Sequence, residues 1–291
     1  MDSAFVSVGL PAALAVVMLG LGLSLTVADF RRVGRRPLPV AAALGTQLLV
    51  LPLVCFGLVL ATGLEPLLAV GMMLLAASPG GTTANLFSHL FRGDVALNIT
   101  LTAVNSVLAV LTLPVVLGLS LTWFGLGGTV GLQVGKTLQV FAVVLVPVAV
   151  GMVVRRVAPG FADRADRPVR ILSAVVLAGV IAGALLAERD GLVGLLVDVG
   201  LVVVAFCVIS LALGYLLPRL LRVDHRQAVA SAFEVGIHNS TLAIAVAVGV
   251  LGVERLAVPA AVYGVLMFPL ALAAGVVFAR VPTRSEEPVP S

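Results

Sequence analysis

Two short polar stretches interrupt apolar runs of this sequence, and they hold the residue types from which a binding site can be built. Residues 78–85 read Ser-Pro-Gly-Gly-Thr-Thr-Ala-Asn, and residues 233–241 read Phe-Glu-Val-Gly-Ile-His-Asn-Ser-Thr. Glu234 and His238 are ionisable groups inside a run that is otherwise apolar from residue 228 to residue 250. An ionisable group in hydrocarbon is costly unless it is paired or binds an ion, so Glu234 is a candidate functional residue.

The residue types near the two stretches favour a hard monovalent cation. Glu234 supplies one full negative charge, and neutral oxygen atoms are available from Gln47, Asn85, Asn98 and Thr102. Asn98 and Thr102 are four residues apart, so they share one face of a helix. Hard cations take such oxygen ligands, whereas zinc would need a Cys and His cluster that the sequence lacks. Interrupted apolar segments in both halves of a chain point to a transporter's binding site.

The half-helices that restart after the two breaks could bind an anion at their N-terminal ends. A helix that restarts offers unsatisfied N–H groups and a positive dipole end, which favour a carboxylate. The two restarts predict a substrate site that includes Thr82, Thr83, Asn239 and Ser240. The alternative for each polar residue of the two sites is an interhelical hydrogen bond that only holds helices together.

The elements that must position these residues are membrane helices. Of the 291 residues, 60% are hydrophobic and 11% charged, and the mean hydropathy is +1.19. This composition excludes a soluble globular domain. The basic residues lie in short segments between apolar runs, so the pI near 9.8 does not predict a nucleic-acid partner. Cys55 and Cys207 are expected to be small buried side chains rather than a disulfide.

The apolar runs predict an all-α polytopic membrane protein, since about 20 apolar residues cross the hydrocarbon of a bilayer. We expect nine transmembrane helices, at residues 4–28, 37–61, 66–91, 94–122, 131–157, 168–187, 192–217, 226–251 and 257–280. Residues 1–280 are therefore predicted to form one transmembrane domain. Residues 281–291, which carry Pro, Ser and Glu, are predicted to be a disordered tail.

The distribution of basic residues predicts the orientation. Of the 18 Lys and Arg residues, all but Lys136, Arg189 and Arg255 fall in one alternate set of loops or in the tail. The positive-inside rule then places the N-terminus outside and the C-terminus in the cytoplasm of a plasma or inner membrane. The first apolar run lacks a basic leader, so we expect it to be a spanning helix rather than a signal peptide.

The chain resembles the bile acid:sodium symporter family along nearly its whole length. The matching residues are 18–23 with Asp29 and Phe30, Gln47, 78–82 with Asn85, 92–97, 214–217, 234–236 and 239–240. The resemblance implies a panel domain (helices 4–28, 131–157 and 168–187) and a core domain (helices within 37–122 and 192–280). It implies an inverted repeat whose two discontinuous helices cross, and symport of a small organic anion, pantoate-like acids among them, with sodium ions as coupling ions.

The resemblance also assigns ligands to two sodium sites. The first would use Asn85, Asn98, Thr102 and Glu234, and the second would use Gln47, Glu234, the carbonyl groups of Val235 and Ile237, and His238. Ala84 stands where the family often has serine, and His238 where it commonly has glutamine. Histidine offers only nitrogen and titrates near neutrality. Either a proton on His238 replaces the second sodium, or His238 only hydrogen-bonds across the crossing.

Other functions fit the sequence less well. A proton-coupled or uncoupled organic-anion permease of the same superfamily stays open, and a passive channel would reuse the same polar groups. A metalloid carrier would need a thiolate at the break, where Ser78 stands. We expect no enzymatic activity, because Ser240 lies too close in sequence to His238 for a nucleophile and base pair. The expected partners are sodium, a small organic anion and the bilayer, with no other cofactor, and the sequence is compatible with a monomer.

Overall fold

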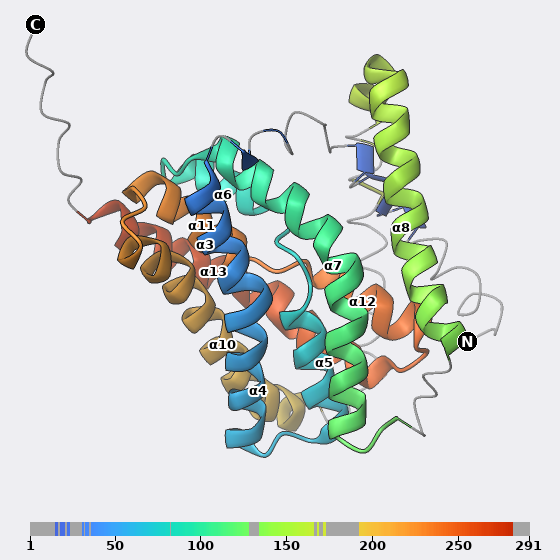
Figure 1. Ribbon diagram of the computed structural model, residues 1–291. Helices are drawn as coiled ribbons and strands as arrows, with labels where there is room; N and C mark the ends of the chain where they lie inside the picture. Colours follow the sequence, from blue (N-terminus) through green and yellow to red (C-terminus); the bar gives the residue numbers. More distant parts are fainter. Residues whose placement is uncertain are drawn as a thin grey trace, which may run out of the picture.

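The computed structural model describes residues 36–81, 83–127, 134–165 and 192–281, with a few further positions between residues 15 and 34 and between residues 168 and 172. Every named element within these residues is a helix. The one β-type pairing among them is an isolated bridge between Gly80 and His238. Figure 1 shows the helices packed side by side, with α8 at one edge of the bundle. The predicted all-helical class is therefore confirmed.

Four described segments are long and apolar enough to cross a membrane. They are Pro37–Thr62, Val95–Trp123, Val199–Leu220 and Glu254–Ala279. Their positions agree with the spans predicted at 37–61, 94–122, 192–217 and 257–280. Helix α8 (Val134–Val157) occupies the span predicted at 131–157. The predicted spans at 4–28 and 168–187 lie almost wholly outside the described residues.

The first long segment contains a turn of π-helix. It consists of α3 (Pro37–Gly45), η2 (Thr46–Val50) and α4 (Leu51–Thr62). Pro52 lies two residues after η2 and has no backbone N–H to donate to the preceding turn, which is consistent with a locally widened helix. π turns are frequent at functional sites, and this one carries the buried side chain of Gln47.

Two predicted spans are each split into half-helices. The first is α5 (Pro66–Ala76) followed by α6 (Thr83–Leu90). The second is α11 (His225–Gly236) followed by α12 (Ser240–Ile244), which continues as η3 (Ala245–Val250). Pro79 and the two glycines after it end the first helix, because proline and glycine are the poorest helix formers. Figure 1 shows the connections between these half-helices near the middle of the bundle.

Straight helices surround the split ones. They are α7 (Val95–Trp123), α10 (Leu192–Leu220) and α13 (Val258–Ala279), the last preceded by the short η4 (Glu254–Ala257). Helix α11 packs against α3, α6, α7, α10 and α13. Its contact with α10 is close, since a Cβ added at Gly236 would lie 2.4 Å from the side chain of Leu211. α11 is therefore a central helix of the described bundle.

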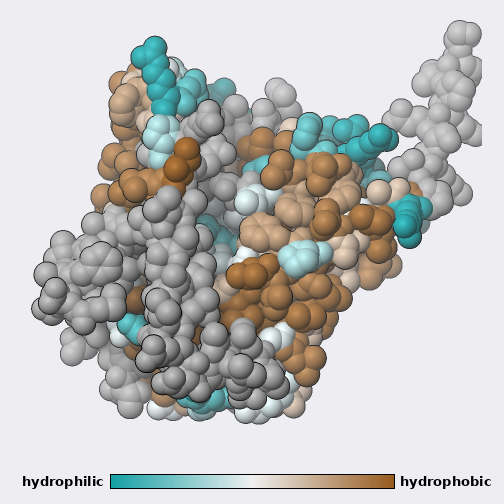
Figure 2. All heavy atoms as spheres, turned by 180° about the vertical axis from the view of Figure 1, so that it is seen from behind, coloured by the Kyte–Doolittle hydropathy of each residue, from teal (hydrophilic) through white to brown (hydrophobic). Residues whose placement is uncertain are grey.

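The outer surface is apolar. Leu53, Leu119 and Leu201 are 70%, 68% and 72% exposed, and Figure 2 shows apolar side chains over much of the described surface seen from behind. Exposed apolar surface on this scale is a liability in water and the normal state of helices in a bilayer. The fold is that of a polytopic membrane protein whose polar residues face inward.

Candidate functional site

The two helix breaks are joined by backbone hydrogen bonds. The Gly81 N–H donates to the Ile237 carbonyl at 2.7 Å, and the Asn239 N–H donates to the Pro79 carbonyl at 2.8 Å. Backbone groups released from a helix must find partners where water is scarce. Each break supplies partners for the other, so the two interruptions are stable only together.

Glu234 lies in the last turn of α11, beside this junction, and is 1% exposed. Its Oε2 accepts a hydrogen bond from the Thr102 hydroxyl at 2.5 Å, while its Oε1 has no hydrogen-bond partner. The Asn105 amide lies next to the same carboxyl group. None of the ion pairs among the described residues involves Glu234. The carboxyl group therefore has one satisfied oxygen and one that can bind a further group.

Gly80 packs directly on this carboxyl group. A Cβ added to Gly80 would lie 2.3 Å from both Cδ and Oε1 of Glu234, so a larger residue here would displace the carboxyl group. Glycine is therefore needed here for close approach rather than for a special backbone angle. The sequence marked Gly80 only as a helix breaker, and its contact with Glu234 is a feature that the pattern did not reveal.

Several amide oxygens nearby are buried without a donor. Asn98 donates its Nδ2 to the Ala230 carbonyl at 2.7 Å, which leaves its Oδ1 without a partner. Gln47 donates its Nε2 to the Ser78 carbonyl at 3.0 Å, which leaves its Oε1 unsatisfied. The Oδ1 of Asn85 is also buried and unpaired. Buried acceptors normally find a donor or an ion, so these orphaned oxygens, like the Glu234 carboxylate, have the chemistry of cation ligands.

His238 lies in an aromatic recess on the other side of the junction. Its ring stacks on Phe206 with centroids 5.4 Å apart and meets Tyr263 edge-on at 5.4 Å. Its Nδ1 is 3.3 Å from the Ser78 carbonyl oxygen and 3.4 Å from Nε2 of Gln47, while Nε2 has no partner. The Tyr263 hydroxyl donates to the carbonyl group of Gly236 at 2.8 Å, which fixes the end of α11.

The predicted cation ligands fall into two contacting pairs and several flanking residues. Thr102 contacts Glu234 directly, and Gln47 contacts His238. Asn98 is one turn before Thr102, whose hydroxyl also lies 3.0 Å from the Asn98 carbonyl. The remaining ligand candidates are Val235, Ile237 and Asn85. Val235 is fully buried, and the carbonyl group of Ile237 accepts from the Gly81 N–H. Asn85 has no hydrogen bond to Glu234 among the described residues.

The predicted anion ligands are arranged less uniformly. Thr83 begins α6, and Thr82 lies outside the described residues. Asn239 caps α12, because its Oδ1 accepts from the Leu242 N–H at 3.0 Å. Ser240 is buried, and its hydroxyl has no partner. Of these residues, Ser240 has the orphaned polar group that most needs a ligand.

Comparison with known proteins bears on this site. A model of the Sodium Bile acid symporter family matches residues 11–195, more than half of the chain. The chain is 30% identical over 254 residues to an uncharacterized sodium-dependent transporter, YocS, of Bacillus subtilis (strain 168), covering 87% of this chain and 77% of that protein.

One plant relative and one animal relative are longer than this chain. A probable sodium/metabolite cotransporter of Arabidopsis thaliana, BASS1, chloroplastic, is 30% identical over 87% of this chain and 62% of its own length. The P3 protein of Homo sapiens is 32% identical over 72% of this chain and 44% of its own length. With the family match and these relatives, the chain belongs to the sodium bile acid symporter family.

Proposed function

We propose that this protein is a sodium-coupled symporter of a small organic anion that works by alternating access around the junction of the two breaks. The observation that carries the proposal is Glu234, a buried carboxylate with one oxygen unpartnered at the point where two interrupted helices meet. Relatives named as sodium-dependent or sodium/metabolite transporters support the choice of ion.

Charge balance favours a monovalent cation. The candidate ligands comprise one carboxylate and neutral amide, hydroxyl and carbonyl groups, so a single sodium ion makes the site neutral. A divalent cation in the first position would leave a net positive charge in a low-dielectric interior before the substrate arrives, which is costly. The charge of the second sodium ion proposed below is balanced by the substrate anion. Within the described residues, no group of three His, Cys, Asp or Glu side chains forms a site for another metal.

We assign the ligands to two positions. Glu234, Thr102, Asn98 and Asn85 hold the first sodium ion. The second position uses Gln47, His238, Glu234 and the carbonyl groups of Val235 and Ile237. Because histidine replaces an oxygen ligand there, the second position binds sodium more weakly than the first.

The substrate anion is proposed to bind at the restarts of the two split helices, with Thr82, Thr83, Asn239 and Ser240. The buried, unpartnered hydroxyl of Ser240 supports this position. Sodium is then required before the anion, because an uncompensated Glu234 carboxylate would repel a second negative charge nearby.

The proposed architecture extends the described part of the fold. The order straight, split, straight occurs as α3–α4, α5/α6, α7 and again as α10, α11/α12, α13, which supports an inverted repeat within a core domain. We propose nine helices in residues 1–280, a panel domain of three of them, and a cytoplasmic tail at 281–291. The N-terminus lies outside a plasma or inner membrane, as the basic residues indicate.

The test is coupled flux in proteoliposomes. External small organic acids, pantoate among them, should stimulate entry of radioactive sodium, and taurocholate should stimulate it less. Replacement of external sodium by potassium should abolish uphill uptake of the stimulating acid. Uptake that continues in potassium would favour the alternative, a proton-coupled or uncoupled permease. Sodium entry that no organic anion stimulates would contradict symport.

A further inference from the structure

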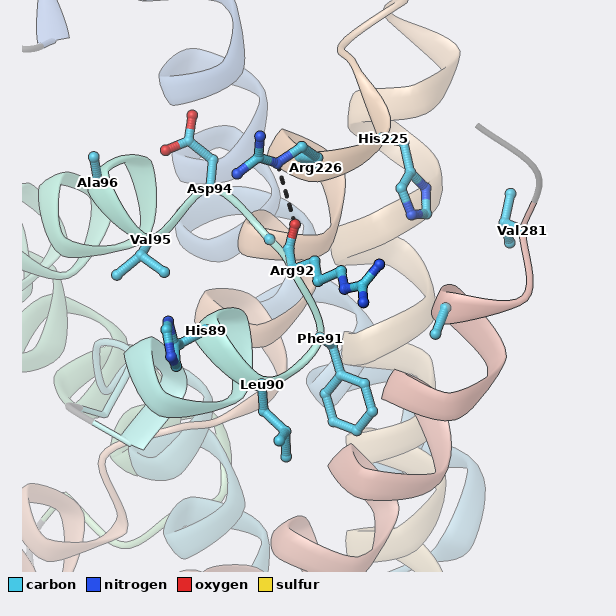
Figure 3. Close-up of a pocket in the computed structure, with 12 residues that line it drawn as sticks. His89, Leu90, Phe91, Arg92, Asp94, Val95, Ala96, His225, Arg226 and Val281 are labelled. Atoms are coloured by element: carbon cyan, nitrogen blue, oxygen red, sulfur yellow. Dashed lines mark hydrogen bonds between the residues drawn. The ribbon is translucent and has the colours of Figure 1, made fainter. Parts of the chain in front are cut away.

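A basic pocket lies at one end of the bundle, away from the helix breaks. It has a volume of about 1110 Å³ and is formed by the end of α6, the turn into α7, the start of α11 and the end of α13. Its polar lining consists of His89, Arg92, His225 and Arg226, and Asp94 at the rim, while Leu90 and Phe91 belong to its apolar lining. Figure 3 shows that the Arg92 side chain extends toward the space between His225 and Val281.

The two arginines of this pocket have no acidic partner among the residues that the structure describes. Among the described residues, neither Arg92 nor Arg226 forms an ion pair. Arg226 donates only its Nε, at 3.3 Å to the Arg92 carbonyl, and its terminal nitrogens point toward the side on which Asp94 lies (Figure 3). The carboxylate of Asp94 is already engaged by Arg36 at 2.5 Å and by the Leu97 N–H at 3.0 Å.

The backbone at Arg92 has an unusual conformation. Arg92 ends α6 in the left-handed conformation, with φ of 56°, and the following Gly93 N–H donates to the Ser88 carbonyl at 2.7 Å. This helix-ending position is normally glycine, because a side chain makes it unfavourable.

The pocket is tied to the helix that carries Glu234. The Asp94 N–H donates to the Arg226 carbonyl at 2.9 Å, and Arg226 lies two helical turns before Glu234 on the same face of α11. A ligand that bridges Arg92 and Arg226 would therefore hold the turn between α6 and α7 against the start of α11.

We propose that this pocket binds a phosphate-bearing anion, with Arg92 and Arg226 as its direct ligands. Guanidinium groups match the oxygen atoms of phosphate with paired hydrogen bonds. Basic pockets between helices at the cytoplasmic face of membrane proteins bind anionic headgroups, and the arginine distribution puts this end of the bundle there. Leu90 is 59% exposed and offers an apolar surface for an acyl chain. A phospholipid headgroup and a free phosphate ester share the chemistry that the arginines recognise.

The chain offers a matched control for testing this site. Arg222 ends α10 in the same left-handed conformation, with φ of 64°, and is followed by the same type of hydrogen bond, from the Val223 N–H to the Pro218 carbonyl at 2.9 Å. Arg222 does not line the pocket. Arg92→Gly and Arg222→Gly each remove one guanidinium group and relieve the same backbone strain, so only the pocket distinguishes them.

The experiment measures binding to the full-length protein in detergent by native mass spectrometry and by the thermal unfolding midpoint. The probes are phosphatidylglycerol, phosphatidylcholine with the same acyl chains, and glycerol 3-phosphate. Phosphatidylglycerol should bind and raise the midpoint. Its affinity should fall about tenfold or more in Arg92→Gly, since hydrogen bonds to a charged group are lost, and stay unchanged in Arg222→Gly.

The possible results distinguish a lipid site from a site for phosphate esters, and some of them would overturn the proposal. Binding of phosphatidylglycerol without glycerol 3-phosphate identifies a lipid site, and binding of both identifies a site for phosphate esters in general. Equal losses in Arg92→Gly and Arg222→Gly would overturn the proposal, because they would indicate attraction to basic surface alone. The proposal would also be overturned if neither phosphatidylglycerol nor glycerol 3-phosphate bound. Arg226→Gln, measured in the same way, provides a second variant that leaves the left-handed turn untouched.

Discussion

Replacement of Glu234 by glutamine isolates the charge on which the proposed cation site depends. The two side chains have nearly the same shape, and the amide oxygen of glutamine can still accept from Thr102, which lies 2.5 Å from the carboxylate. The substitution removes a buried charge that forms no ion pair among the described residues. The sodium-free variant should therefore be at least as stable as the sodium-free wild type.

The expected loss of sodium affinity follows from Coulomb's law. A sodium ion about 4 Å from the carboxylate charge gains about 4 kcal/mol at an effective dielectric constant of about 20. Loss of that attraction weakens binding about a thousandfold. Sodium at about 100 times its dissociation constant stabilises the wild type by about 2.7 kcal/mol, so the variant should lose essentially all of this stabilisation.

The assay is the thermal unfolding midpoint of purified protein in sodium chloride and in choline chloride at equal ionic strength. Glu254→Gln is the matched control, because Glu254 is exposed at the start of η4. The control should keep the sodium-dependent rise in midpoint, and Glu234→Gln should lose it. A rise of equal size in Glu234→Gln and the wild type would refute the assignment of the carboxylate to the cation site.

Three further predictions follow from the same geometry. Gly80→Ala should remove the sodium-dependent rise in midpoint, because its Cβ would lie 2.3 Å from the Glu234 carboxyl group. The control Gly57→Ala should keep the rise, since no atom lies within 4 Å of its added Cβ. An equal rise in the two variants would contradict the close packing of Gly80 on Glu234. Tyr263→Phe should lower the unfolding free energy by about 1 kcal/mol, since it leaves the buried Gly236 carbonyl with only the weak Cys207 thiol, at 3.9 Å, as a donor. An unchanged midpoint would show that this bond contributes nothing. Burial and a neighbouring arginine lower the pKa of His225. Its contribution to stability is therefore present above the unfolded pKa of about 6.5 and is lost as the pH falls below that value. The unfolding midpoint of His225→Gln should fall less on acidification than that of the wild type, and parallel curves of midpoint against pH would contradict this.

The helices that cross the membrane without interruption could be predicted from the sequence because the length of an apolar run is set by the thickness of the bilayer. The breaks could also be predicted, since Pro79 with two glycines, and Glu234 with His238, interrupt such runs locally. These features depend on a few neighbouring residues. The pairing of the two breaks depends on residues about 160 positions apart, and apolar periodicity carries no information about it.

In the site, too, local features could be predicted from the sequence and contacts between distant residues could not. The shared face of Asn98 and Thr102 follows from helical spacing, and the structure adds the contact of Thr102 with Glu234. The approach of Gly80 to that carboxyl group could not be predicted, because it depends on how two half-helices pack. The substrate role predicted for Asn239 stays a prediction, and the structure adds that its side-chain oxygen caps α12, a role that asparagine often has.

The left-handed turns at Arg92 and Arg222 were also hidden from sequence reasoning. Glycine normally signals such helix ends, and arginine carries no such signal. Both arginines were interpreted only as markers of membrane orientation. Their conformations, and the pocket beside Arg92, emerge only when the ends of α6, α11 and α13 are brought together.

Equilibrium binding of radioactive sodium to the purified protein tests the central claim most directly, because it needs no knowledge of the transported anion. The account predicts saturable binding to the wild type that unlabelled sodium displaces, that survives in Glu254→Gln and that disappears in Glu234→Gln. Saturable binding of the same affinity to wild type and Glu234→Gln would contradict it.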